Sequence, residues 1–301
     1  MAGFFAALTA SVIWGFSPAF FSLLNAVPRD ELLAHRIAWA CVFVLAYCVA
    51  TGRIGRVRAA LGDRRLMRPL MLSATFMTVN WFIFLLAVGA GRVFESGIGY
   101  YMMPLMSVGL GVALLGERLN RRQWLAVALA AVAVAVLSFG VGVAPWLALA
   151  LGGTFASYGF IRKRTDVGSI VGFQVEILLV TPAALIWLAG VHWLGWHGIG
   201  GGVPALFGAD GFISLMLVAS GIMTGLPLIL FAEATRRMEY STVGLMQYVN
   251  PSIQVATAGV LLGEHFSRWH WWALALIWCA LAIYGRELLR QGRERRRVAA
   301  P

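Results

Sequence analysis

Two prolines, Pro104 and Pro251, lie in apolar stretches at equivalent positions of an internal repeat. A proline inside a helix removes one backbone hydrogen bond and frees a carbonyl oxygen. In a membrane that oxygen needs a protein group, a water molecule or a ligand as its partner. Matched helix breaks in the two halves of a chain are typical of the binding site of a secondary transporter. A passive kink that only shapes helix packing is the alternative.

Polar and aromatic side chains near these prolines are predicted to line a cavity between the runs 67–90, 95–116, 210–235 and 241–262. Amide and phenol groups without a fixed central charge suit a neutral, zwitterionic or amphipathic solute. The alternative role for any one of them is an interhelical hydrogen bond, worth about 0.6 kcal/mol on average. The predicted substrate-binding residues are Trp14, Arg36, Asn80, Trp81, Tyr100, Tyr101, Gln247, Tyr248, Asn250 and Gln254.

Arg36 stands inside an apolar run, where an arginine costs roughly 2.5–3.5 kcal/mol and usually faces protein or water. Its candidate partners are Glu176, which aligns with it in the repeat, and Glu95. Substrate binding and a purely structural role both remain open for this arginine. His35 and Glu176 are the candidates for proton coupling, because an imidazole and a carboxyl group can each take up and release a proton.

The sequence contains none of the motifs that would indicate enzyme chemistry or ATP hydrolysis. We find no HExxH, no GxSxG with a partner histidine, no paired acidic cluster and no Walker A sequence. We therefore predict no catalytic residues, no cofactor and no bound metal ion. An intramembrane enzyme, a lipid scramblase and a structural membrane subunit remain the alternatives to a transporter.

The elements that must position these residues are long apolar runs. Of the 301 residues 60% are hydrophobic and 12% are charged, against about 25% charged residues in a soluble domain. Ten runs of about 18–25 residues can each cross a bilayer as a helix, whereas β-strands would be shorter and would alternate. The prediction is an all-α polytopic membrane protein with spans at 3–24, 30–51, 67–90, 95–116, 122–140, 144–161, 168–190, 210–235, 241–262 and 269–286.

The net charge of +11 is distributed in a way that indicates membrane topology rather than nucleic-acid binding. Twenty of the 24 Lys and Arg residues lie in one set of loops and in the tail, while Arg29, Arg92 and Arg268 lie in the opposite loops. The positive-inside rule therefore predicts a multi-pass protein of a bacterial inner membrane with both termini in the cytoplasm. The basic tail is expected to contact anionic lipid headgroups of the bilayer.

The chain repeats itself at an offset of 147 residues, which aligns tyrosine, proline, Gly-Glu, arginine and tryptophan in register. Five spans form one repeat, so the second copy begins on the other side of the membrane and is inverted, as in many secondary transporters. The predicted units are residues 1–141, residues 142–290 and a basic tail, 291–301. Identical pairs are Gly97/Gly244, Tyr101/Tyr248, Pro104/Pro251, Gly116/Gly263, Glu117/Glu264, Arg121/Arg268 and Trp124/Trp271.

Several short motifs resemble the RarD branch of the EamA family in the drug/metabolite transporter superfamily. They are Trp14-Gly15, LAHRIAW (33–39), VNWFIF (79–84), GYYMMP (99–104), LLGERL (114–119), QYVNP (247–251) and LLGE (261–264). The resemblance extends from about residue 2 to residue 288. It implies a ten-helix bundle that transports a small molecule across the inner membrane, and it names no substrate. The inverted repeat, for its part, suits alternating access, because the two halves can exchange conformations to open either side.

Overall fold

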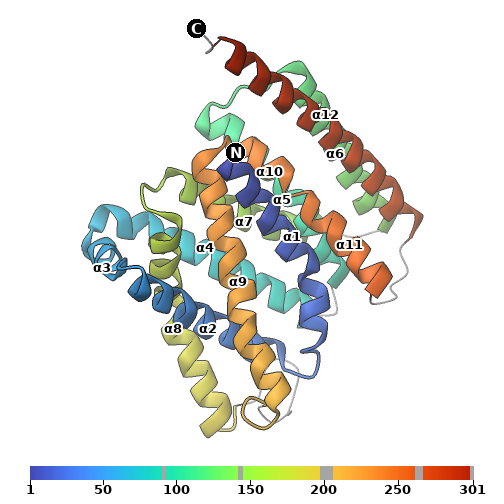
Figure 1. Cartoon of the computed structure of the whole chain (residues 1–301). Coiled ribbons are helices and arrows are strands. Elements are labelled where there is room, and N and C mark those ends of the chain that lie inside the picture. The colour runs from blue at the N-terminus through green and yellow to red at the C-terminus, as the bar shows by residue number, and fades with distance from the viewer. Residues whose placement is uncertain (90–92, 142–144, 197–205, 262–266, 299–301) are drawn as a thin grey trace.

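A computed structural model describes residues 1–89, 93–141, 145–196, 206–261 and 267–298 (Figure 1). Within these ranges the secondary structure is helical, apart from an isolated bridge between Phe207 and Asp210. The helices are α1 (Ala2–Ser22), α2 (Arg29–Ala50), α3 (Ile54–Gly62), α4 (Arg64–Gly89), α5 (Val93–Leu115), α6 (Arg121–Val141), α7 (Pro145–Arg164), α8 (Ser169–Trp193), α9 (Gly211–Arg237), α10 (Tyr240–Met246), α11 (Val249–Leu261) and α12 (Arg268–Val298).

The helices follow the predicted apolar runs closely, because long apolar runs satisfy their backbone groups internally as helices. The ninth run is divided into α10 and α11, and α3 lies in the polar connection before α4. By length and composition, five helices within the described ranges could cross a membrane: α1, α2, α6, α8 and α9. The all-helical class is confirmed, whereas the number of ten spans and their inversion stay predictions.

Local signals set several helix ends. Pro28 precedes α2, where its missing N–H costs no intrahelical bond. The Asp210 carboxylate accepts a hydrogen bond from the Ile213 N–H at 2.9 Å and caps α9. Directly after α5, Gly116 has a φ of 67°, a left-handed conformation that glycine adopts without a Cβ clash.

Neither Pro104 nor Pro251 interrupts a helix, contrary to the prediction. α5 runs through Pro104 without interruption, so no break occurs there. In the ninth run the break lies at Gln247–Tyr248, and Pro251 is the third residue of α11. The first N–H groups of a helix have no intrahelical acceptor, so a proline in this first turn is tolerated rather than disruptive. Pro251 therefore helps to start a helix just after the break.

The helices pack in a pattern that joins the two predicted halves. α1 packs on α9 and α11, α7 packs on α4 and α5, and α2 packs on α8 and α9. The remaining main contacts are α4 with α8, α7 with α9, α5 with α10, and α6 with α12. In Figure 1 the α6–α12 pair lies at one edge of the bundle. The first and second predicted halves are thus packed into each other rather than side by side.

Close packing of α2 and α9 depends on Gly221. A Cβ at this position would lie 2.5 Å from the carbonyl carbon of Trp39 and 2.6 Å from the Ala40 nitrogen. Both are backbone atoms, which cannot move aside as the end of a side chain can. Glycine here lets the two helices approach, and this approach brings the Arg36 and Thr224 side chains together.

Candidate functional site

The predicted substrate residues of α4 and α5 lie around small cavities in the middle of the bundle. Asn80 and Tyr100 line one cavity together with Met103, Leu151 and Phe155. Trp81 lines a second one with Tyr158, Phe173 and Glu176, among others. Each has a volume of about 10 Å³, which is room for a single water molecule. A drug-sized ligand needs about 300–1,000 Å³, so the bundle is closed around these residues.

The break between α10 and α11 holds the second group of predicted residues. Gln247, Tyr248 and Asn250 are buried, with 1%, 0% and 5% exposure. Within the described part of the chain, neither amide atom of Gln247 nor the Tyr248 hydroxyl has a hydrogen-bond partner. Buried amides normally have one, so these groups are free to bind a ligand that enters this part of the bundle.

Trp14 and Gln254 connect α1 to α11. The Gln254 amide donates to the Trp14 carbonyl at 3.3 Å and to the Asn250 side-chain oxygen at 3.0 Å. The Trp14 indole stands edge-on to Phe155, with 5.7 Å between the ring centroids. Trp14 therefore bridges α7 and α11 by packing and by one backbone hydrogen bond.

The repeat-related residues around the two prolines meet in space. Tyr101 and Tyr248 belong to one apolar cluster between α5, α6, α10 and α12. A Cβ on Gly244 would lie 3.0 Å from the Pro104 carbonyl oxygen, so α5 and α10 cross closely here. Tyr101 and Tyr248, which are paired in the sequence repeat, therefore lie in the same part of the bundle.

Arg36 is held by neutral groups. Its Nε donates a hydrogen bond to Thr224 Oγ1 at 2.9 Å, and its guanidinium carbon lies 4.6 Å from the Phe21 ring centroid. Glu176, a predicted partner, does not pair with it, and the Glu95 side chain lies outside the described residues. Arg36 therefore joins α2 to α1 and α9 from inside the bundle.

Glu176 instead forms a buried network with residues from α4 and α7. Arg162 Nε lies 3.5 Å from Glu176 Oε1, and the arginine is fully buried. The Ser73 hydroxyl donates to Oε1, and the Tyr158 hydroxyl donates to Oε2 at 3.4 Å. Sequence reasoning placed Arg162 in a basic loop. The one signal in the sequence was the position of Arg162 in the last turn of α7. Lys163 and Arg164, the other basic residues of this turn, contact the Thr235 carbonyl oxygen and the Phe160 ring instead.

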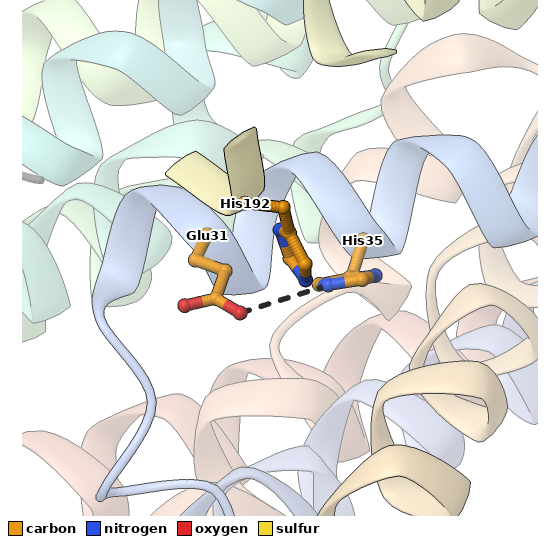
Figure 2. Close-up of side chains that lie close together, drawn as sticks. All are labelled: Glu31, His35 and His192. Carbon is orange, nitrogen blue, oxygen red and sulfur yellow. Dashed lines mark ion pairs between the residues drawn. The ribbon is translucent and has the colours of Figure 1, made fainter. Parts of the chain in front are cut away.

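His35 lies in a different cluster from Glu176. Its Nε2 is 3.8 Å from Glu31 Oε1, and its ring stands 6.2 Å from that of His192 (Figure 2). The two candidates for proton coupling are therefore not brought together. Glu31 and His192 were not singled out by the sequence, because 157 residues separate the histidine of α8 from His35 and no motif links them.

A polar cluster ties α5, α7, α9 and α10 together where α10 begins. The Glu117 carboxylate accepts hydrogen bonds from the Tyr240 and Ser241 N–H groups. The Lys163 ammonium donates to the Thr235 and Met238 carbonyl oxygens at 3.1 and 2.6 Å. Burial lowers the pKa of Lys163, while the nearby Glu117 carboxylate acts against this shift. Glu117 thus serves as an N-terminal cap of α10.

Comparison with known proteins agrees with this architecture. The model of the EamA-like transporter family matches residues 1–139. Protein RarD of Streptomyces exfoliatus is 37% identical over 294 residues, which cover 96% of this chain and 90% of the relative. This chain belongs to the EamA family. The apolar helices and the family together make it a multi-pass membrane protein of the transporter type, as the RarD resemblance implied.

A further relative and a solved structure are similar to this chain over nearly its whole length. An uncharacterized transporter of Pseudomonas aeruginosa is 36% identical over 298 residues, covering 96% of this chain and 94% of the relative. A solved crystal structure superposes with a TM-score of 0.72 at 21% identity, over 94% of this chain and 97% of the other. This last match concerns the fold alone.

Proposed function

We propose that this EamA-family protein is a secondary transporter that exports small neutral, zwitterionic or amphipathic metabolites or drugs by alternating access. Its ten spans form two inverted repeats, residues 1–141 and 142–290, followed by the cytoplasmic tail 291–301. The protein resides in the bacterial inner membrane with both termini in the cytoplasm, and the proton is the candidate coupling ion.

The helix contacts are the observation that carries this proposal. Exchanging the repeats turns α1 into α7, α2 into α8, α4 into α9, α5 into α10–α11 and α6 into α12. The contact of α1 with α9 then becomes that of α7 with α4, and α5 with α7 becomes α11 with α1. The contacts α2–α8, α5–α10 and α6–α12 map onto themselves. This two-fold pattern supports a pair of repeats that can exchange conformations to open either side.

Polar residues of both repeats support a substrate site near the crossing of α5 with α10. Gln247 and Tyr248 provide unpartnered polar atoms at the helix break, and Asn80 and Tyr100 line a neighbouring cavity. The closed packing agrees with an occluded arrangement, because alternating access requires the halves to separate before a solute can enter.

Arg36 has no carboxylate among its described contacts. Its positive charge is therefore available for an anionic group of a zwitterionic solute.

Glu176 is the stronger candidate for proton coupling. Its carboxylate lines the cavity beside Trp81 and forms an ion pair with Arg162, which joins α8 to α7. Protonation of Glu176 would remove the charge that attracts Arg162 and would weaken this link between two helices of one repeat. His35 stands in a separate cluster and has no such contact with the cavity in the described structure.

Thiol labelling can test the site. In a background with Cys41, Cys48 and Cys279 replaced by serine, we expect the Tyr100→Cys and Gln247→Cys variants to react with a membrane-impermeant, polar maleimide. Phe139→Cys is the matched control, since Phe139 on α6 is 86% exposed and would face lipid. The proposed site is wrong if both cavity positions are as unreactive as the control.

Flux measurements test transport itself. Medium and cells of a deletion strain and an overexpressing strain should differ in a small set of metabolites, and those compounds should move through the purified protein in proteoliposomes. A protein that moves phospholipid between leaflets but no solute would instead support the scramblase alternative.

A further inference from the structure

Three side chains that can ligate a metal ion meet where α2 begins and α8 ends. Glu31 and His35 stand four residues apart, so they share one face of α2. His192 reaches the same place from the last turn of α8. Figure 2 shows the three side chains converging on one space, with the ion pair between Glu31 and His35 drawn.

The distances in this cluster are short enough for a shared ion. Glu31 Oε1 and His35 Nε2 are 3.8 Å apart, and one potential ligand atom from each of the three residues lies within 4.8 Å of the others. Two ligands of a tetrahedral zinc ion, each about 2.0–2.2 Å from the metal, lie about 3.4 Å apart. Small side-chain rotations are therefore sufficient to complete three bonds.

The potential ligand atoms of the two buried residues make no hydrogen bonds within the described residues. Glu31 is 1% exposed and His35 is 4% exposed. Within the described part of the chain, neither carboxylate oxygen of Glu31 nor Nε2 of His35 has a hydrogen bond. A carboxylate that is buried without hydrogen bonds is unfavourable, and a cation held between these atoms would remove that cost.

The surroundings orient the ligands as metal sites do. His192 Nδ1 lies 3.0 Å from the Leu188 carbonyl oxygen, which can only accept, so Nδ1 donates and Nε2 is left with a free electron pair. Metal-bound histidines usually make this kind of bond with their second nitrogen. The Phe207 ring covers His35, with 4.7 Å between the ring centroids, and provides an apolar wall.

We propose that Glu31, His35 and His192 bind a divalent transition-metal ion, for which Zn²⁺ is the best match. Two imidazoles and one carboxylate are a common zinc donor set that leaves a fourth position for water or another ligand. The ion would join α2 to α8, which are equivalent helices of the two repeats and pack against each other. It would therefore clamp the two halves together at this end of the bundle, which the proposed topology places outside the cell.

Zinc binding to the purified protein tests the proposal without any transport assay. The full chain is purified through a tag that contains no histidine, stripped with a chelator and titrated with Zn²⁺ in competition with a chromophoric chelator. We expect one ion per chain, and we expect Glu31→Gln, His35→Gln and His192→Gln each to weaken binding at least about tenfold. His270→Gln, at a histidine on α12, is the matched control and should bind as the wild type does.

Two further measurements keep the result unambiguous. His192 is exposed at a helix end, so His192→Gln should fold even if Glu31→Gln does not. Zn²⁺ should raise the melting temperature of the wild type but not that of His192→Gln, and bound Co²⁺ should give the strong visible absorption of a tetrahedral site only in the wild type and in His270→Gln. The proposal is overturned if the wild type binds no stoichiometric Zn²⁺, or if His192→Gln binds it as tightly as the wild type.

Discussion

At the scale of single residues, the Arg162–Glu176 pair is the most consequential feature. Both side chains are buried, so solvent screens their charges only weakly. We expect Glu176→Gln to destabilise the protein by about 3–5 kcal/mol, because it leaves the arginine buried without a counter-charge. In detergent this should lower the melting temperature by on the order of 10 °C.

A surface pair of the same chemistry provides the control. Arg236 lies 4.0 Å from the exposed carboxylate of Asp166, and water screens both charges. Asp166→Asn should leave the melting temperature unchanged. Equal melting temperatures for Glu176→Gln and Asp166→Asn would mean that the Arg162–Glu176 pair is not buried in the membrane-embedded protein.

Arg36 leads to a different prediction, because its partners are neutral. Thr224→Val removes the acceptor of the part-buried Arg36 Nε hydrogen bond and should cost about 1.5–3 kcal/mol, the usual contribution of a hydrogen bond to a charged group. The Arg36→Lys variant should be less stable than the wild type, because an ammonium lacks the planar group that stacks on Phe21.

Arg29 serves as the reference for Arg36. It begins the same helix and is exposed, so Arg29→Ala should have little effect on the melting temperature. If Arg36→Lys melts and transports like the wild type, the arginine reaches the membrane surface instead, and the described contacts do not matter in the bilayer.

At the scale of helices, the crossing of α2 and α9 depends on the space at Gly221. A Cβ there would collide with backbone atoms of Trp39 and Ala40, so Gly221→Ala should push the helices apart. Overpacking of this kind typically costs about 1–3 kcal/mol. This loss of stability is measured as a lower melting temperature of the purified Gly221→Ala variant than of the wild type.

Gly285 on α12 is the matched glycine for this experiment. A Cβ there would meet no heavy atom within 4 Å, so Gly285→Ala should keep stability or raise it by up to about 1 kcal/mol through helix propensity. A Gly221→Ala variant that is as stable as Gly285→Ala would show that α2 and α9 are not in close contact.

At the scale of the whole molecule, topology is the first property to test. The distribution of basic residues predicts that reporter fusions near residues 60, 92, 163, 200 and 238 alternate between inside, outside, inside, outside and inside. A cytoplasmic signal from the fusion near residue 200 would contradict both the ten spans and the inversion of the second repeat.

The membrane class, the helix positions and the internal repeat could be predicted from the order of residues. Each depends on local properties: a run of apolar residues must form a helix in lipid, and a repeat is visible as register, as with Tyr101 and Tyr248. The family was recognisable for the same reason, since its motifs are short and contiguous. Even the break in the ninth run was signalled by Pro251, although the proline lies in the first turn of α11 instead of interrupting a helix.

The choice of partner for each charged side chain depended on tertiary packing. Glu176 aligns with Arg36 in the repeat but pairs with Arg162. This is because α7 and α8 both pack on α4, which brings the Arg162 side chain of α7 to the Glu176 side chain of α8. His35 meets His192 only because the ends of two distant helices come together. Hydropathy and spacing report which face of a helix is apolar, but they carry no information about which helix covers that face, and that contact determines where a buried charge finds its partner.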